Sequence, residues 1–400
     1  MAKEMLDGEA APQDGSLPPL TLRNIESQPL SFYVHVPFCA SRCGYCDFNT
    51  YTAEELGPNV SRSSWRESAI AEVRLAKKVL GHRVPVSTVF VGGGTPTLLP
   101  AADLADVIDA IDAEFGLVEN CEITTEANPD SVTAESLETL RVRGFNRISF
   151  GMQSTAPHVL RILERTHTPG RAAEAVTLAK AAGFEHINLD MIYGTPSETV
   201  EDLQKTLDAV LATQVDHVSA YSLIVEEGTR LFNAVKRGAI PMPDDDDMAD
   251  KYELIDATLA GAGFEWYEVS NWAQPGGECR HNLAYWRSTN WWGIGPGAHS
   301  HVNGVRWWNK KHPTSWTQDL ASGNSPAQAR EVIDSESVLV EKVMLKLRLR
   351  EGMKIADLPD ASLVEAEVES GLLEIHNGHA VLTPRGRLVA DGVIHRLLWN

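Results

Sequence analysis

Between residues 31 and 222 the sequence alternates short apolar runs with longer segments of helical periodicity. After the first predicted strand, we interpret five further apolar runs as strands: 88–91, 121–125, 147–150, 186–191 and 217–222. No hairpin signal joins them, so the intervening helices act as crossovers and the strands run parallel. The glycine run at 92–94 lacks the Lys-Ser/Thr of a phosphate loop, and Thr97 falls where a dinucleotide fingerprint needs its last glycine. The pattern predicts an α/β fold, an incomplete (βα)6 barrel of TIM type.

A run of three cysteines follows the first strand of this pattern. Cys39, Cys43 and Cys46 have CxxxCxxC spacing directly after the apolar segment 32–36. Such thiols can converge on a structural zinc, which needs four protein ligands, or on an iron–sulfur cluster. No fourth ligand follows at the usual spacing, and a cubane cluster held by three cysteines leaves one iron open to a small molecule. We therefore favour a [4Fe-4S] cluster, with zinc as the alternative.

Length, charge and cysteine use limit the class of protein. The 400 residues suit one large α/β domain and a smaller one. No segment approaches the about 18 apolar residues of a membrane helix, and the N-terminus lacks the pattern of a signal peptide. Five cysteines, three of them in the cluster motif, are too few for a disulfide framework, which favours a reducing cytoplasm. The net charge of −20 argues against a nucleic-acid partner.

Polar residues stand where the predicted strands end. Barrel active sites lie at the carboxyl ends of the strands, and strand alternation directs every second side chain inward. The residues found there are the cysteine loop, Gly92–Thr97, Glu126, Gln153, Asp190 and Tyr221–Ser222. A residue such as Asn188 or Thr124 could be a satisfied structural group instead. The agreement of several strand ends nevertheless favours a single site.

The cysteine spacing resembles that of the radical S-adenosylmethionine (SAM) superfamily, and the strand-end residues suit SAM. Glycines at 93 and 94 allow backbone groups to approach a ligand, although a tight turn is the alternative explanation. Glu126 can accept hydrogen bonds from ribose hydroxyls or an ammonium group. Arg165 can pair with a carboxylate, or can be an ordinary arginine at a helix end.

Five segments resemble the oxygen-independent coproporphyrinogen oxidase family, HemN and its relatives: 33–39, 92–97, 126–129, 150–153 and 189–194. The resemblance implies a radical SAM barrel in which Tyr33, Gly93, Glu126 and the cysteines surround one SAM. It implies a second SAM site, as in the oxidase, formed by Tyr45, Gly94, Thr95, Gln153, Arg165 and Asp190. Two departures weigh against oxidase activity and against the second SAM. Phe48 stands where the oxidases have a further cysteine, and the N-terminal extension is short.

A second motif lies beyond the barrel. Residues 281–286 read His-Asn-x-x-Tyr-Trp, which resembles the haem-binding signature of the HemW haem chaperones. The resemblance implies haem contacts from His281, Asn282, Tyr285 and Trp286, with the imidazole as an axial ligand. The alternative is that the aromatic residues form a core and that His281 caps a turn. Cys279 is an alternative ligand, and His299 and His301 receive no assignment.

We predict four segments along the chain. They are a disordered lead-in (1–30), the radical SAM partial barrel (31–240), a linker and haem-motif region with a tryptophan cluster (241–330), and a HemN-type C-terminal domain (331–400). The last is predicted as a small α+β unit resembling a winged helix, with a hairpin turn at Asn377-Gly378. The acid run 244–247 is predicted as a helix start rather than a metal site.

The predicted function is that of a haem chaperone that binds haem and delivers it to apo-haemoproteins such as respiratory enzymes. It would carry a [4Fe-4S] cluster and SAM. The alternatives are oxygen-independent coproporphyrinogen III oxidase and a radical SAM enzyme with another substrate. Further expectations are a dimer, and contact with membranes only through partner proteins.

Overall fold

The computed structural model describes residues 8–56, 62–166 and 168–399. Its centre is a curved sheet whose middle strands run parallel and lie side by side in chain order. These strands are β2 (Leu30–Val36), β3 (Val86–Gly93), β4 (Leu117–Ala127), β5 (Arg147–Gln153), β6 (His186–Tyr193) and β7 (His217–Ser222). The predicted incomplete (βα)6 barrel is confirmed.

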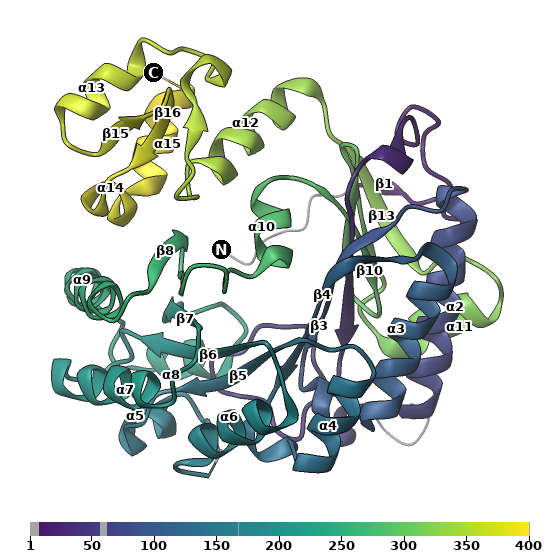
Figure 1. The fold of residues 1–400 in the computed structure, drawn as a ribbon, viewed down its shortest axis with the longest axis horizontal. Helices are drawn as coiled ribbons and strands as arrows, with labels where there is room; N and C mark the ends of the chain where they lie inside the picture. Colours follow the sequence, from purple (N-terminus) through teal and green to yellow (C-terminus); the bar gives the residue numbers. More distant parts are fainter. Residues whose placement is uncertain (1–7, 57–61, 167, 400) are drawn as a thin grey trace.

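Helices cover the outer face of this sheet, and its inner face opens onto the centre of the molecule (Figure 1). The helices of the barrel are α1 (Ala53–Leu56), α2 (Arg62–Leu80), α3 (Ala101–Phe115), α4 (Ala134–Val142), α5 (Pro157–Ile162), α6 (Arg171–Ala182), α7 (Val200–Ala212) and α8 (Arg230–Lys236). Strand alternation explains the two faces. Phe32, Val34 and Val36 of β2 are fully buried against helices such as α2, whereas Tyr33 points the other way and lines a cavity.

Residues 241–330, expected to form a linker and haem-motif region, extend the same sheet at both edges. At one edge β9 (Asn271–Ala273) pairs with β7, and β8 (Glu265–Glu268) follows it. At the other edge β10 (Asn290–Ile294) runs parallel to β2, and β11 (His299–Val302), β12 (Val305–Asn309) and β13 (Ala327–Val332) continue outward. Three helices complete the region: α9 (Asp245–Gly261), α10 (Arg280–Trp286) and α11 (Pro313–Ala321).

Two sequence expectations for this region can be compared with the structure. The acid run begins helix α9 as predicted, because the Asp244 side chain accepts from the backbone N–H of Asp247. Trp272 and Trp316 are fully buried in the main core, so these two tryptophans serve packing rather than a ligand.

The expected disordered lead-in is not observed in its described part. The short strand β1 (Glu9–Ala10) pairs with β13, and Glu9 forms an ion pair with Arg330 at 2.6 Å. Farther along, Ile25 is fully buried in the main core. Ladder hydrogen bonds and one buried apolar side chain therefore order residues 8–29, a contribution that composition alone does not reveal. Residues 1–7 lie outside the described part.

The C-terminal domain has its own core and the predicted order of elements. Its elements are α12 (Ser335–Lys346), β14 (Met353–Lys354), α13 (Leu363–Glu369), β15 (Leu373–His376), β16 (His379–Leu382), α14 (Pro384–Leu388) and α15 (Ala390–Trp399). Asn377 and Gly378 both have positive φ, 50° and 75°, which is the geometry of a two-residue hairpin turn. The α+β arrangement and the hairpin are as expected.

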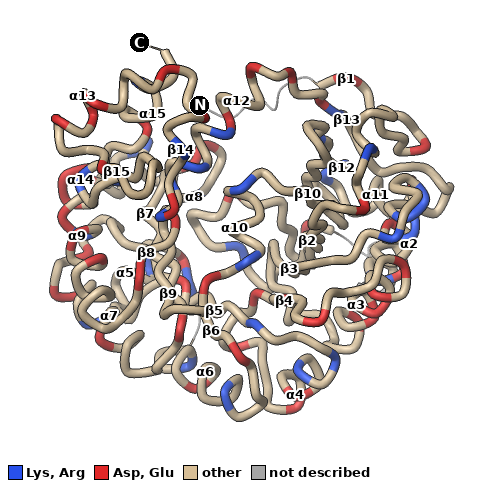
Figure 2. The backbone as a smooth tube through the Cα atoms, turned by 45° about the horizontal axis from the view of Figure 1, so that its top comes forward, with Lys and Arg blue, Asp and Glu red and all other residues tan. Residues whose placement is uncertain are grey.

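The charge distribution follows the layers of the fold. Acidic positions recur along the outer helices α3, α9 and α13, as Figure 2 shows. In the described ranges no helix is both long enough and apolar enough to cross a membrane.

Arg387 joins the C-terminal domain to the barrel. Its guanidinium donates to both carboxylate oxygens of Asp256 on α9, at 3.0 and 2.7 Å, and lies 4.5 Å from the ring centre of Trp266. The Arg387 side chain is only 7% exposed, so this bidentate pair is largely shielded from water.

We expect Arg387→Ala to lower the free energy of unfolding by roughly 2–4 kcal/mol, because the partly buried Asp256 carboxylate loses its cationic partner and keeps, among the described residues, only the Trp272 indole as a donor. Urea unfolding followed by tryptophan fluorescence measures this change. The control is Arg385→Ala, an exposed arginine on the same helix, which should cost less than about 0.5 kcal/mol. Equal losses in the two variants would contradict a role for the Asp256 contact.

Candidate functional site

A cavity of about 560 Å³ lies on the inner face of the barrel. All of the predicted site residues except Trp286 line it. They are Tyr33, Cys39, Cys43, Tyr45, Cys46, Gly93, Gly94, Thr95, Glu126, Gln153, Arg165, Asp190, His281, Asn282 and Tyr285. The cavity therefore combines two groups that are far apart in the sequence, the strand-end residues and the His-Asn-x-x-Tyr-Trp motif.

The cysteine loop leaves β2 and turns back toward α1. Its first residue is fixed by the backbone N–H of Cys39, which donates to the carbonyl of Tyr51 at 3.0 Å. The three thiols are free and half-buried, and Arg165 Nη1 lies 3.6 Å from Cys43 Sγ. Burial raises the pKa of the Cys39 and Cys46 thiols. Metal ions bound at this loop would supply the positive charge that thiolates need.

The glycine loop after β3 packs against the base of the cysteine loop so closely that side chains are excluded. A Cβ on Gly93 would lie 2.5 Å from the His35 ring, and one on Gly94 would lie 2.4 Å from the Phe38 carbonyl oxygen. Gly93 also has a φ of +113°, which favours glycine. Backbone bonds from Gly94 N to Val36 O (2.8 Å) and from Thr95 N to Phe38 O (2.7 Å) join the two loops.

Two carboxyl groups face the cavity from neighbouring parts of the sheet. Glu126 accepts from the Gly93 N–H at 2.9 Å, and burial together with the Asp190 carboxylate raises its pKa to about 8. Asp190 accepts from the Ser149 hydroxyl at 2.9 Å and from the Asn188 amide at 2.7 Å, while burial raises its pKa. Asn188 therefore positions Asp190, which is the structural role that the sequence left open.

Two hydrogen bonds connect β2 to residues 47–51, the segment that follows the cysteine motif. The Tyr33 hydroxyl lies 3.0 Å from His35 Nδ1, and His35 Nε2 lies 2.9 Å from the Asn49 carbonyl. Because a carbonyl only accepts, Nε2 carries the proton and Nδ1 accepts from Tyr33. Burial lowers the pKa of His35 to about 4, so the ring is neutral. Strand alternation puts His35 on the same face as Tyr33, but nothing in the sequence indicates that Asn49 is its partner.

Five buried polar atoms on residues of the cavity wall have no hydrogen-bond partner within the described residues. They are Arg42 Nε, Thr124 Oγ1, Arg147 Nη1, Gln153 Oε1 and Arg165 Nε. Buried polar atoms are nearly always hydrogen-bonded in proteins, so unpaired ones facing a cavity indicate a polar ligand. Together with the three free thiols, this donor set fits a cluster that is ligated by cysteine and a polar molecule beside it.

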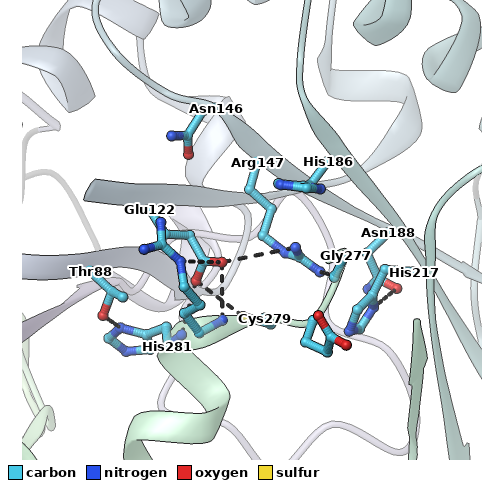
Figure 3. A network of polar contacts seen from close by, with 12 residues as sticks. Thr88, Glu122, Asn146, Arg147, His186, Asn188, His217, Gly277, Cys279 and His281 are labelled. Atoms are coloured by element: carbon cyan, nitrogen blue, oxygen red, sulfur yellow. Dashed lines mark hydrogen bonds and ion pairs between the residues drawn. The ribbon is translucent and has the colours of Figure 1, made fainter. Parts of the chain in front are cut away.

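The floor of the cavity is helix α10, which is held by one carboxylate (Figure 3). Glu122 of β4 is 2% exposed and accepts from the backbone N–H groups of Arg280 (3.0 Å) and His281 (2.9 Å). Cys279 Sγ donates to the same carboxylate at 3.6 Å, and Arg147 lies 3.9 Å from it. Cys279 thus has a structural role here, and the motif helix is fixed to the strands of the barrel.

Both ring nitrogens of His281 are engaged in this arrangement. Nδ1 lies 2.8 Å from Thr88 Oγ1, whose own hydroxyl donates to Ser31 at 2.8 Å, so Nδ1 is the donor. Nε2 lies 2.9 Å from the Tyr285 hydroxyl and accepts from it. Burial lowers the pKa of His281 to about 3, which keeps the ring neutral. Iron ligation through Nε2 would therefore require His281 to release Tyr285.

Trp286, the one predicted residue outside the cavity lining, turns toward the other side of the helix. Burial raises the pKa of the Glu268 carboxyl to about 8, and contacts with the Asn271 amide and then the Trp286 indole oppose that shift. The next residue, Arg287, pairs with Glu351 at 2.7 Å. Helix α10 is thus held on one side by the barrel and on the other by the segment that leads into the C-terminal domain.

Comparison with known proteins gives consistent matches over most of the chain. Residues 33–210 match the model of the radical SAM superfamily, and residues 333–389 match that of the HemN C-terminal domain. The haem chaperone HemW of Mycobacterium tuberculosis is 50% identical over 379 residues, which cover 94% of this chain and 97% of that protein. HemW of Bacillus subtilis is 30% identical over 92% of this chain and 99% of that protein.

Among solved structures, the coproporphyrinogen III oxidase HemN of Escherichia coli, a radical SAM enzyme, superposes with a TM-score of 0.80. It covers 95% of this chain and 92% of the oxidase at 22% sequence identity. At that identity the likeness shows the fold alone.

We expect Glu122→Ala to loosen helix α10, because two backbone N–H groups at its start lose their buried acceptor. A loss of about 1–3 kcal/mol of local stability would speed hydrogen exchange on the order of tenfold to hundredfold. Exchange in the peptide spanning 280–286, read by mass spectrometry, measures it. Glu119→Ala, at an exposed position on the same strand, is the control and should leave that peptide unchanged. Unaltered protection in the Glu122 variant would exclude the carboxylate as the anchor.

Proposed function

Because the chain belongs to the radical SAM superfamily and, within it, to the HemW haem chaperones, we propose that it binds haem and delivers it to apo-haemoproteins. The proposal includes a [4Fe-4S] cluster on Cys39, Cys43 and Cys46 with SAM beside it. The observation that carries it is the composition of one cavity, whose wall holds the three thiols and whose floor is the motif helix.

In this proposal the barrel residues bind and orient SAM. The glycine loop offers backbone groups at close range, Glu126 accepts from hydroxyl or ammonium donors, and Arg165 receives a carboxylate. When bound, the cluster supplies one-electron chemistry and an open iron position for SAM. Tyr33 bonds to His35, and His35 bonds to the Asn49 carbonyl, so the two residues hold the segment 47–51 after the cysteine motif in place.

One residue at the cavity mouth favours the chaperone over the oxidase. Phe48 stands where the oxidases have a fourth cysteine, and it is 60% exposed although it is a large apolar residue. It lines the cavity, and an exposed aromatic ring there suits an apolar ligand better than it suits ligation of iron. Coproporphyrinogen oxidation is therefore the alternative that the experiment below tests.

The proposed setting is a reducing cytoplasm, supported by five cysteines that are all free. The dimer, the contact with membranes through partner proteins and the identity of the recipient haemoproteins stay predictions. The excess of acidic residues supports the expectation that nucleic acid is not a partner.

We expect SAM binding to strengthen as the pH rises from about 6.5 to 8.5, by up to about tenfold per unit below the pKa of Glu126. Since that pKa is raised to about 8, the free protein holds a neutral carboxyl at pH 7, and a donor-rich ligand must displace its proton. Calorimetry of the anaerobically reconstituted protein, in two buffers of different ionisation enthalpy, would detect the released proton.

The control is Glu126→Gln, which has no titratable proton at this position. It should bind SAM more weakly, by roughly 1.5–3 kcal/mol, and without the additional pH dependence. The titration of SAM's own amine is common to both proteins and cancels in the comparison. An identical pH dependence in wild type and variant would exclude Glu126 from the SAM site.

The function itself is tested by titrating haem into the reconstituted protein and following its absorption band. We expect saturable binding, and transfer of the band to an apo-haemoprotein on mixing. In a parallel incubation with SAM, a reductant and coproporphyrinogen, we expect no vinyl product. Vinyl formation, or haem uptake that does not saturate, would contradict the chaperone function.

A further inference from the structure

A second cavity, of about 580 Å³, adjoins the first along the cysteine loop. The two share Tyr33, Arg42, Phe48, Gly93, Glu126 and Tyr285. The three cysteines do not line the second cavity. Its remaining wall comes from His35 of β2 and from Asp47 and Asn49–Tyr51 after the cysteine motif. Trp291, Gly297–His299 and Lys311, at the far edge of the sheet, complete it. Its volume lies within the range of about 300–1,000 Å³ that is usual for sites of large organic ligands.

His299, left unassigned by the sequence, stands in this wall at the start of β11. The residue is only partly shielded from water, and neither ring nitrogen has a hydrogen-bond partner within the described part of the chain. The ring is held by stacking on Trp308 at 5.9 Å, while its backbone carbonyl accepts from Trp291 Nε1 at 3.1 Å. Burial lowers the pKa of His299, and the nearby cations Lys311 and Arg306 lower it further. The imidazole is therefore neutral and can donate a lone pair.

The other histidine of this wall, His35, offers no lone pair. Its two ring nitrogens are already bonded to Tyr33 and to the Asn49 carbonyl. His281 of the motif helix has both nitrogens bonded as well, and it does not line the second cavity. Tyr285, the hydroxyl partner of His281, does line it and meets Trp291 edge-on at 4.8 Å. The motif therefore reaches this cavity through its tyrosine rather than its histidine.

The rest of the lining suits a flat apolar ring with carboxylates at its edge. The aromatic side chains are Tyr33, Phe48, Tyr51, Tyr285 and Trp291. Two cations, Arg42 and Lys311, stand in the same wall with two carboxyl groups, Asp47 and Glu126. Arg42 also lies 3.6 Å from Glu55. Lys311 forms no ion pair with the described residues, although its neighbour Lys310 pairs with Asp319 at 2.6 Å. An unpaired cation in a chain of net charge −20 is available to an acidic ligand group.

We propose that haem occupies this second cavity with His299 as an axial ligand of its iron, and with Lys311 and Arg42 facing its propionates. Phe48 and Trp291 cover the macrocycle. Tyr285, held by His281, forms the wall shared with the SAM cavity. This assignment rests on the proposed haem-binding function and gives His281 a positioning role in place of ligation.

The test is haem titration into the full-length reconstituted protein, read as the absorption and electron paramagnetic resonance spectra of the bound iron. His299→Gly should lose the signature of histidine ligation, and added imidazole, which fits the space left by the side chain, should restore it. His281→Gly should keep that signature with affinity lowered by roughly tenfold, and imidazole should not alter it. His299→Met should give a methionine-ligated spectrum, which keeps the test valid if the glycine variant folds poorly.

A control variant, His379→Gly in the C-terminal domain, reports adventitious coordination by a remote histidine and should match wild type. The assignment is overturned if His299→Gly retains the wild-type spectrum, or if imidazole restores ligation in His281→Gly. Wild-type protein that shows no saturable haem spectrum would instead refute the proposed function. The two failures are thus distinguishable in one series of titrations.

Discussion

The carboxylate of Glu122 is the contact on which the rest of the site depends. It lies inside the barrel and accepts the first two N–H groups of α10, a helix that comes more than 150 positions later in the chain. A carboxylate so deeply buried is tolerated because Arg147 and the helix N-terminus offset its charge. Without it the open inner face of the sheet would have no floor, and Tyr285 would lose the backbone that places it between the two cavities.

The two cavities differ in their polar groups. The first holds carboxyl groups of raised pKa and unpaired amide and guanidinium atoms, and these suit a ligand with many donors. The second holds two cations beside its aromatic rings, together with the carboxyl groups of Asp47 and Glu126. Glu126, Tyr33 and Tyr285 belong to both linings, so a change of ligand in one cavity alters groups that the other ligand also meets. This shared wall offers a direct physical route by which SAM and haem could influence each other.

Much of this could be predicted from the sequence, for identifiable reasons. The parallel strands follow from apolar runs joined by helical segments, and residues at strand ends converge because parallel strands finish at one edge. The glycine loop could be proposed as a close-approach site because consecutive glycines follow a strand, and the structure gives the reason: a Cβ would not fit beside His35 and Phe38. Contacts between distant segments were not predictable. The pairing of β10 with β2, the ordering of residues 8–29 against β13, and the Asn49–His35 bond each depend on tertiary register, to which local periodicity gives no access.

The motif helix shows that a sequence motif can locate a site while leaving the role of each of its residues open. The sequence pointed to His281 because imidazole is a common haem ligand, and the helix does lie at the site. In the structure both ring nitrogens of His281 are bonded, to Thr88 and to Tyr285. Neither ring nitrogen of His299 has a hydrogen-bond partner within the described residues. Hydrogen-bond saturation thus discriminates between the two histidines, and it can be read only from the folded structure. Under the proposal above, the motif histidine orients a tyrosine, and ligation of iron belongs to a residue outside the motif.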